Sequence, residues 1–293
     1  MEKKKLIILI SVGAVVAGGM ATVGYFLGTK VFKQEVKYVY DTDSMIQNYD
    51  EVYAKYKKDN KSNYINYRPH EVANIAILNL KNEKHFRRVT KGSVLATGIE
   101  QKIRSNSVRN DDVYMSESLS YSSLVQVAFR AYMNTDKSWY YEGDVNANDI
   151  TTASWNVNSK KAMSHEDYKK EWGKTLDEPV IYIISSKTVK KTSTYEKVDG
   201  GYNLHLVLNP QISTANYITQ MVRTSNLSKD PIFYTVDLYM ELNEDLKIKK
   251  ITYHETYDVY KIIWNSSVAD IVDTYFYEEA NVPEITENCD YGE

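Results

Sequence analysis

The sequence predicts an α+β protein, in which an N-terminal transmembrane helix precedes a curved antiparallel sheet wrapped over two or three helices. Three observations lead to this prediction. An uncharged run extends from Leu6 to Gly28. From Phe86 onward, long segments alternate polar and apolar residues between polar turns, as half-buried strands do. Few segments have helical spacing, and long consecutive strands form a twisted sheet that needs apolar helices to cover one face.

The composition excludes several classes of protein. The chain has 293 residues and a net charge of -3, so no overall positive field favours a nucleic-acid partner. Cys289 is the only cysteine, which excludes a disulfide framework and a cysteine-based zinc site. The 26 tyrosines, against 12 glycines and 5 prolines, suit long strands with amphipathic aromatic side chains.

The first predicted element is a membrane helix. Residues 1–5 form a short cytoplasmic tail, and residues 6–28 are long enough to cross a hydrocarbon core of about 30 Å. The apolar run continues past the weak cleavage site at Gly19–Ala21, so an uncleaved signal-anchor is favoured over a cleaved signal peptide. Lysines on the two sides of the span nearly balance, and the default for an N-terminal anchor exports the domain that follows. We therefore expect a single-pass protein of a bacterial plasma membrane with an extracytoplasmic C-terminal domain.

Small residues recur along the predicted span. Gly13, Ala17 and Ala21 are four positions apart, and such a stripe permits close approach of two helices in lipid. The stripe predicts a homodimer, although small residues are also common in membrane helices that do not associate.

Residues 29–65 are predicted to be a connector that contains an amphipathic helix over residues 44–58. Ser44 begins a capping-box pattern, and apolar residues follow it at helical spacing. Pro69 suits a first helical position and predicts a second helix over residues 69–84, apolar around most of its circumference and therefore deeply buried.

The predicted extracytoplasmic domain spans residues 66–283 and is followed by a polar tail, residues 284–293. Its first strands lie in SVLATGIEQKIRSNSVRN, DVYMSESLSYSS and LVQVAFRAYMN. Ser164 predicts the N-cap of a helix over residues 164–178.

The C-terminal third predicts a hairpin followed by a meander. Gly200-Gly201 between the alternating segments 186–198 and 201–209 predicts a tight turn, and Ser213 predicts the N-cap of another helix. The meander is expected to contain a strand from Pro231 to Leu242, a strand from Leu246 to Trp264, a turn at Asn265–Ser267 and a last strand that stops near Pro283.

These segments resemble the half-barrel lipoprotein-carrier superfamily of bacterial envelope proteins. The resemblance lies in YEKVDGGYNLHLVLN, VDLYMELNEDLKIKKITYHETYDVY and ADIVDTYFYEEANVPE. It implies a half-barrel with an apolar cavity, between sheet and helices, that receives acyl chains. Members of this superfamily are soluble in the periplasm or carry lipid on an N-terminal cysteine, whereas this chain is predicted to carry a peptide anchor.

The chain offers no recognisable catalytic constellation. Its five histidines include no HExxH pair, and it has no GxSxG elbow, Walker loop, dinucleotide fingerprint or calcium loop. We therefore predict a protein that is not an enzyme and that uses neither a cofactor nor a metal.

Two functions remain open. The first is a membrane-anchored extracytoplasmic protein that binds a lipid or another amphiphile in an apolar cavity, and the alternative is a scaffold subunit of an envelope, secretion or conjugation complex. One face of the predicted strands supplies the residues expected to line the cavity, and the same pattern is typical of a closed core. These residues are Leu204, Leu206, Leu208, Tyr234, Val236, Leu238 and Met240.

Overall fold

The computed structural model describes residues 38–96, 98–122, 126–145, 153–155, 161–225, 227–260 and 264–278. The predicted membrane helix over residues 6–28, its small-residue stripe and the polar tail with Cys289 lie outside these residues. Among the helices that the structure describes, none has both the length and the apolar character needed to cross a bilayer.

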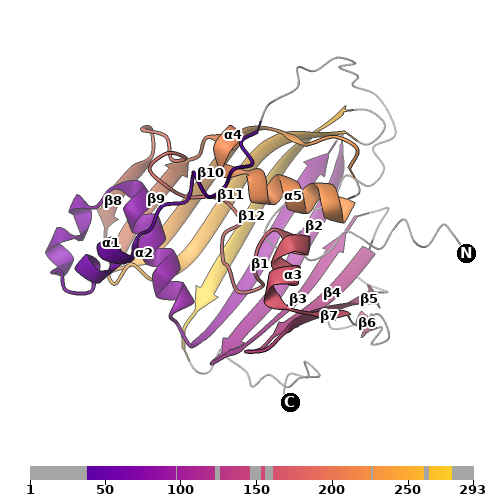
Figure 1. The fold of residues 1–293 in the computed structure, drawn as a ribbon, viewed down its shortest axis with the longest axis horizontal. Helices are drawn as coiled ribbons and strands as arrows, with labels where there is room; N and C mark the ends of the chain where they lie inside the picture. The colour runs from indigo at the N-terminus through magenta and orange to yellow at the C-terminus, as the bar shows by residue number, and fades with distance from the viewer. Residues whose placement is uncertain are drawn as a thin grey trace, which may run out of the picture.

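One antiparallel sheet of twelve strands dominates the domain (Figure 1). The strands are β1 (His85–Ala96), β2 (Ile99–Asn110), β3 (Val113–Tyr121), β4 (Gln126–Met133), β5 (Ser138–Val145), β6 (Ala153–Trp155), β7 (Lys161–Met163), β8 (Thr194–Val198), β9 (Gly201–Val207), β10 (Ile232–Asn243), β11 (Ile248–Tyr260) and β12 (Trp264–Phe276). Their order is β6-β5-β4-β3-β2-β1-β12-β11-β10-β9-β8, with β7 paired to β5. Two meanders, one from each half of the chain, therefore meet where β1 pairs with β12, and the sheet stays open.

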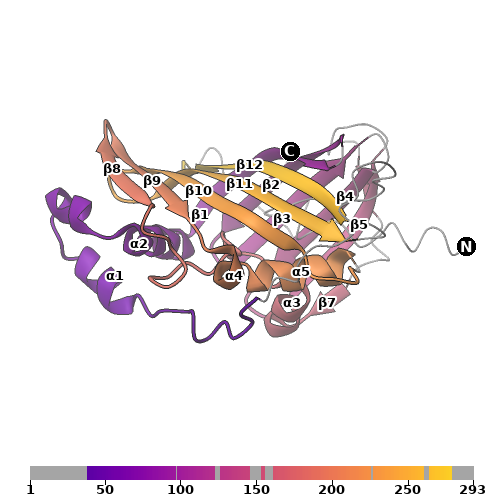
Figure 2. The ribbon, with the colours of Figure 1, turned by 90° about the horizontal axis from the view of Figure 1, so that it is seen from above.

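The helices gather on one face of this sheet (Figure 2). They are α1 (Asp50–Tyr56), the 3-10 helix η2 (Lys61–Asn66), α2 (Pro69–Lys81), α3 (His165–Trp172), α4 (Pro210–Ser213) and α5 (Ala215–Ser225). Helix α2 contacts β9 and β11, α4 contacts β10, and α3 contacts β5. The face toward the helices is called the inner face below, and the opposite face the outer face. The predicted α+β arrangement, an antiparallel sheet covered by a few helices, is confirmed.

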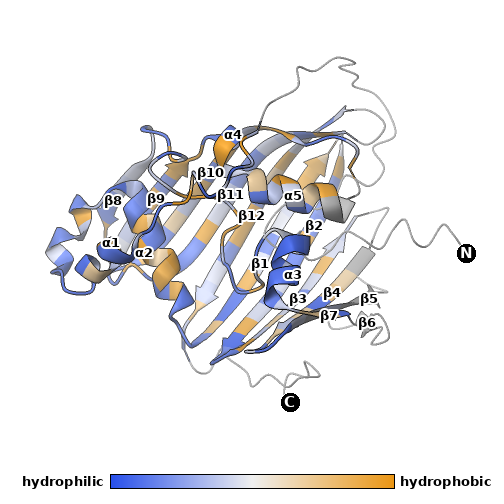
Figure 3. Cartoon of the chain, viewed as in Figure 1, coloured by the Kyte–Doolittle hydropathy of each residue, from blue (hydrophilic) through white to orange (hydrophobic). Residues whose placement is uncertain are grey.

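The hydrophobic core lies between the inner face and the helices. Hydrophobic and hydrophilic residues alternate along the long strands (Figure 3), so every second side chain enters the core. Ile251 and Tyr253 of β11 are fully buried, as are Val72 and Ile75 of α2. The predicted deep burial of the second helix is confirmed for the side of α2 that faces the sheet.

Three predicted helices have different ends in the structure. Helix α2 ends at Lys81 rather than at residue 84. Helix α1 begins at Asp50 rather than at Ser44. Ser44 lies in a turn, where its backbone N–H donates to Asp41 Oδ1 at 3.3 Å, and such local side-chain bonds compete with a helix start. Helix α3 has the predicted cap, since the Asp167 N–H donates to Ser164 Oγ at 3.1 Å. It ends at Trp172 instead of residue 178 because Gly173 takes a left-handed conformation, with φ of 74°.

Two further predictions in the C-terminal third, a helix cap at Ser213 and a turn at Asn265–Ser267, differ from the structure. The helix predicted after Ser213 is present as α5, but Ser213 is not its N-cap. Ser213 is the last residue of α4, whose own N-cap is Asn209, with Oδ1 accepting from the Gln211 N–H at 3.2 Å. The predicted turn at Asn265–Ser267 is wrong, since these residues belong to β12 and Ser267 pairs with both Tyr257 and Ala96. Asn and Ser favour turns, but here the ladder with β11 continues through all three residues, and Ser267 also pairs with β1.

The tight hairpin predicted around Gly200-Gly201 joins β8 to β9. Gly200 has a φ of +72°, with open space where a side chain would be. Gly201 must be glycine for another reason: a Cβ there would lie 2.0 Å from the Leu242 carbonyl oxygen of β10. The first strand of this hairpin is shorter than predicted, because residues 186–193 form a loop.

We expect Gly201→Ala to destabilise the domain more than Gly200→Ala. The first substitution forces two paired strands apart, and we expect it to lower the free energy of unfolding by about 2 kcal/mol. The second only requires a left-handed alanine, at about 1 kcal/mol. Urea denaturation of both variants measures the order, and a larger loss for Gly200→Ala would contradict the close approach of β9 and β10.

Candidate functional site

A groove of about 710 Å³ opens on the helix side of the domain, between α2, α3 and the segment over residues 174–184. The ends of β2 and β4 that carry Arg109 and Met133 close it on the sheet side. Its volume lies in the range of ligand sites, which are concave and mainly apolar with a few polar groups.

Helix α2 forms one wall of the groove. Pro69 at its first position and Glu71, whose carboxylate accepts from the Arg68 N–H at 2.8 Å, fix its start. Its inward residues pack on the sheet, which leaves Ile77 and Leu78 half-buried at the groove. These two side chains make the middle of the wall apolar, and the polar Asn74 and Lys81 of the same helix line it on either side.

The segment that follows Gly173 forms the floor. Pro179, Ile181 and Tyr182 are buried and line the groove. Two hydrogen bonds fix the segment: the Ile183 N–H donates to the Ser213 carbonyl at 3.0 Å, and Asn74 Nδ2 of α2 donates to the Ile184 carbonyl at 3.1 Å. This short apolar run has no strand or helix of its own, so its backbone is held by neighbouring elements.

Charged side chains of both signs stand around the groove. Three are cationic and three acidic, so their charges balance. Arg109 Nη2 lies 3.4 Å from Asp177 Oδ2 and Lys169 Nζ lies 3.6 Å from Glu178 Oε1, which places two ion pairs at the edge. The six residues are Lys81, Arg109, Lys169, Asp112, Asp177 and Glu178.

His165 is the groove's histidine, and both of its ring nitrogens have partners. Nδ1 lies 2.9 Å from Ser138 Oγ, and Nε2 lies 3.2 Å from the Thr135 carbonyl oxygen. These bonds fix the ring at the start of α3, so His165 joins α3 to β5 and to the β4–β5 turn rather than serving as a free base.

Buried ionisable groups lie behind the floor. Tyr182 donates a hydrogen bond to Glu255 Oε1 of β11, and burial raises the pKa of Glu255 to about 8. Lys174 is buried and donates to the Glu178 carbonyl, and burial lowers its pKa to about 7. Charges inside a domain shift in these directions because desolvation disfavours the ionised form.

The structure places six of the seven predicted cavity residues in the core. They are at most 1% exposed, belong to one hydrophobic cluster and do not line the groove. Whether they contact a ligand stays a prediction. The six are Leu204, Leu206, Leu208, Val236, Leu238 and Met240.

Tyr234 does not share their face. It is 50% exposed, whereas Phe233 is 4% exposed and turns inward. The cause is an irregularity between β10 and β11, at which the register shifts between Phe233 and Thr235. One extra residue in a strand reverses the alternation on one side of it.

In the described ranges, histidine, cysteine, aspartate and glutamate do not form a group of three or more able to hold a metal ion. Sequence periodicity missed this groove because its floor is irregular, and the run PVIYII over residues 179–184 was the available signal.

The sheet is open and antiparallel with its helices on one face (Figure 2), and several solved structures are similar to this chain over most of their own length at low identity. "LprF" from Mycobacterium bovis matches with a TM-score of 0.32 and 8% identity over 71% of this chain and 91% of that chain. A putative outer membrane lipoprotein-sorting protein domain from Vibrio parahaemolyticus matches with a TM-score of 0.28 and 10% identity, over 75% and 94%. A DUF1329 family protein from Desulfovibrio piger has a TM-score of 0.24 and 12% identity, over 71% and 90%.

No protein-family model matches this sequence, and no curated protein sequence matches it.

Proposed function

We propose that this chain is a membrane-anchored, extracytoplasmic protein without catalytic activity, which binds the apolar part of an amphiphile in the groove between α2 and α3. One observation carries the proposal: a groove of about 710 Å³ joins an apolar wall and floor to a charged rim. An amphiphile has the same division between an apolar tail and a polar head.

The lining indicates how such a ligand would lie. Ile77, Leu78 and Ile181 offer apolar contact along the wall and floor, and Ile46, 59% exposed, extends this surface at the mouth. Burying an acyl chain here contributes about 0.8 kcal/mol for each CH₂ removed from water. The head group would remain at the rim.

The rim favours an uncharged or zwitterionic head group. Arg109 and Lys169 already pair with acidic side chains, and the lining has as many acids as bases. A ligand with a large net charge would meet like charges whatever its sign.

We expect Ile46→Glu to weaken binding of an NBD-labelled lysophosphatidylcholine about tenfold, because it places a carboxylate beside the acyl chain without disturbing the core. Ile65→Glu is the matched control, since Ile65 is 42% exposed on η2 and does not line the groove. Fluorescence titration of the full chain in detergent-free nanodiscs measures both affinities.

Leu78→Glu places a charge deeper in the wall and is expected to abolish binding, with thermal melting to check the fold. Wild type that fails to bind the probe, or an Ile46→Glu variant that binds it as tightly as wild type does, would exclude this groove as the site. Equal loss in both variants would point to a general surface effect.

A further inference from the structure

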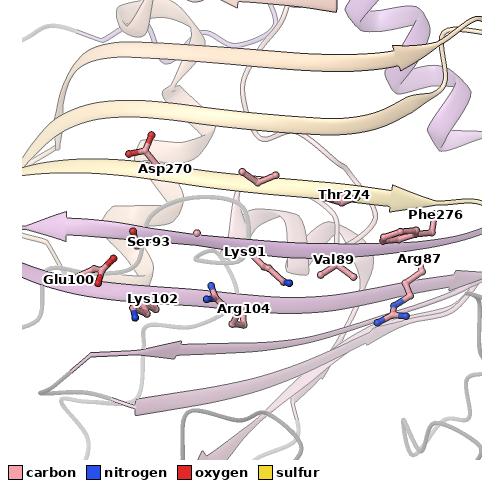
Figure 4. A pocket seen from close by; sticks show the side chains of 12 residues that line it. Arg87, Val89, Lys91, Ser93, Glu100, Lys102, Arg104, Asp270, Thr274 and Phe276 are labelled. Carbon is pink, nitrogen blue, oxygen red and sulfur yellow. The ribbon is translucent and has the colours of Figure 1, made fainter. Parts of the chain in front are cut away.

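The outer face of the sheet carries a second hollow, far from the helices (Figure 4). It has a volume of about 720 Å³ and runs across β12, β1 and β2. Its lining includes four cations, Arg87, Lys91, Lys102 and Arg104, and two acids, Glu100 and Asp270.

Three of these cations are adjacent in the sheet. Lys91 is the cross-strand partner of Arg104, and Lys102 is the partner of Ser93, two residues further along β1. Like charges opposite one another destabilise a sheet, so the fold gains nothing from this cluster. A cluster that costs stability and faces solvent is a candidate for recognition of an anion.

Within the described residues, the three cations Lys91, Lys102 and Arg104 have no carboxylate at ion-pair distance. Other cations of the outer face do, since Lys250 Nζ lies 2.7 Å from Glu241 Oε1. Asp270 is the cross-strand partner of Ser93 on β12. Its Oδ1 accepts a hydrogen bond from His254 Nδ1 at 2.7 Å. The positive charge of the hollow is therefore available to an external partner.

Apolar and aromatic side chains lie beside the hollow, at the end of the sheet where β1 ends and β12 begins. Leu95 and Val268 are cross-strand partners and are 49% and 37% exposed. The rings of Tyr260 and Trp264 lie 5.3 Å apart, and Lys229 Nζ lies 4.4 Å from the Tyr260 ring centre. Tyrosine, tryptophan and lysine together are typical of surfaces at the membrane–water interface.

The described chain also begins at this end of the sheet. Tyr38 Oη accepts a hydrogen bond from the Phe233 N–H at 2.8 Å, near the start of β10, and Tyr40 donates to Asp230. The connector from Gly28 to Tyr38 spans at most about 36 Å when fully extended. A membrane segment over residues 6–28 would therefore hold this end close to the bilayer.

We propose that the outer face of β12, β1 and β2, from the basic hollow to the Leu95–Val268 end, docks on the anionic surface of the membrane that anchors the chain. Lys91, Lys102 and Arg104 contact phosphate head groups, and the exposed aliphatic side chains with the half-buried Tyr260 and Trp264 enter the interface. This inference rests on the proposed membrane anchor but not on the groove, which lies on the opposite face and stays open to the envelope space.

The docking surface is tested by acetylating the lysines of the full chain in nanodiscs and measuring the rate at each lysine by mass spectrometry. In phosphatidylglycerol nanodiscs we expect Lys91 and Lys102 to react about fivefold more slowly than in phosphatidylcholine nanodiscs. Lys57, directly after α1, and Lys187, in the helix-side loop, are both exposed and are expected to react equally in both. High salt is expected to reduce the difference.

A variant with two reversed charges gives a second test of the docking surface. Lys91→Glu combined with Arg104→Glu is expected to abolish the slower reaction of Lys102 in anionic nanodiscs, whereas the matched double reversal Lys57→Glu with Lys187→Glu leaves it unchanged. If the chain inserts but Lys91 and Lys102 react at the same rate in anionic and in zwitterionic nanodiscs, the docking surface is overturned while the anchor and the groove are not.

Two other outcomes would also overturn the proposal. Protection of Lys91 and Lys102 by a soluble polyphosphate, without any effect of anionic lipid, would indicate a polyanion as the partner. Failure of the full chain to enter either nanodisc would remove the anchor together with the docking surface, and lipid binding in the groove would then be tested separately by fluorescence.

Discussion

Asp273→Asn is expected to lower the free energy of unfolding by about 3–5 kcal/mol, the usual loss when one partner of a buried ion pair is removed. Asp273 is fully buried on β12, and Arg88, 3% exposed, lies beside it on β1. The closest charged atoms, Arg88 Nη1 and Asp273 Oδ2, are 3.9 Å apart. The variant leaves the guanidinium without its counter-charge in the core, which is why the loss is large.

The surroundings show that Asp273 is held as an acceptor. Thr90 Oγ1 donates to Asp273 Oδ1 at 2.6 Å, and Tyr253 Oη lies 3.4 Å from Oδ2. Arg88 has fewer partners, since Nη2 donates to Ser107 Oγ at 3.2 Å while Nε has no hydrogen-bond partner. The guanidinium therefore depends on the carboxylate for most of its stabilisation.

A double substitution that removes both charges separates the loss of the pair from the loss of one partner. Arg88→Met combined with Asp273→Leu is expected to be more stable than Asp273→Asn alone, because no buried charge is left uncompensated. Glu241→Gln, which breaks the exposed pair with Lys250, is the control and is expected to cost less than about 1 kcal/mol. Urea unfolding gives all the values, and a loss for Asp273→Asn as small as that of the control would show that Arg88 does not need its partner.

The same strands show why the sheet was predictable from the sequence while the polar interior was not. Alternation places Ile251 and Tyr253 of β11 inward, and it equally places Glu255 inward. Periodicity identifies the face of a strand on which a residue lies but not the partner that makes a buried carboxylate tolerable. That partner, Tyr182, comes from a segment 73 residues away in the chain.

The candidate site was unpredictable for a related physical reason. Alternation along β9 and β10 correctly indicates that Leu206 and Leu238 face inward, but a closed core and a ligand cavity have the same pattern. The side chains that line the groove come from an irregular segment and from the exposed side of α2. Tyr234 shows the remaining limit, because one shift in strand register moved it to the outer face.

Glu255→Gln is expected to make the protein more stable than wild type above about pH 6, by an amount that grows up to about pH 8. Glu255 is fully buried, and desolvation is the largest effect on its carboxyl group, raising the pKa from 4.5 to about 8. The hydrogen bond from Tyr182 to Glu255 Oε1 opposes this shift. The other carboxyl oxygen of Glu255, Oε2, has no hydrogen-bond partner.

The sign follows from proton binding in the two states. Between pH 4.5 and 8 the folded protein keeps the proton on Glu255 while the unfolded chain has lost it, so the free energy of unfolding falls as pH rises through this window. The full loss is on the order of 5 kcal/mol. Glutamine resembles the protonated carboxyl and carries no charge at any pH, so the variant avoids the loss.

Thermal melting of wild type and variant between pH 5 and pH 9 measures this difference. Lys174 also titrates inside the domain, but its contribution is present in both proteins and cancels in the comparison. Glu241→Gln controls for removing one negative charge at an exposed position. Because Tyr182 lies between Glu255 and the groove, ionisation of Glu255 is expected to loosen the groove floor before the sheet. A difference between variant and wild type that stays constant from pH 5 to pH 9 would show that Glu255 is already ionised in the folded protein.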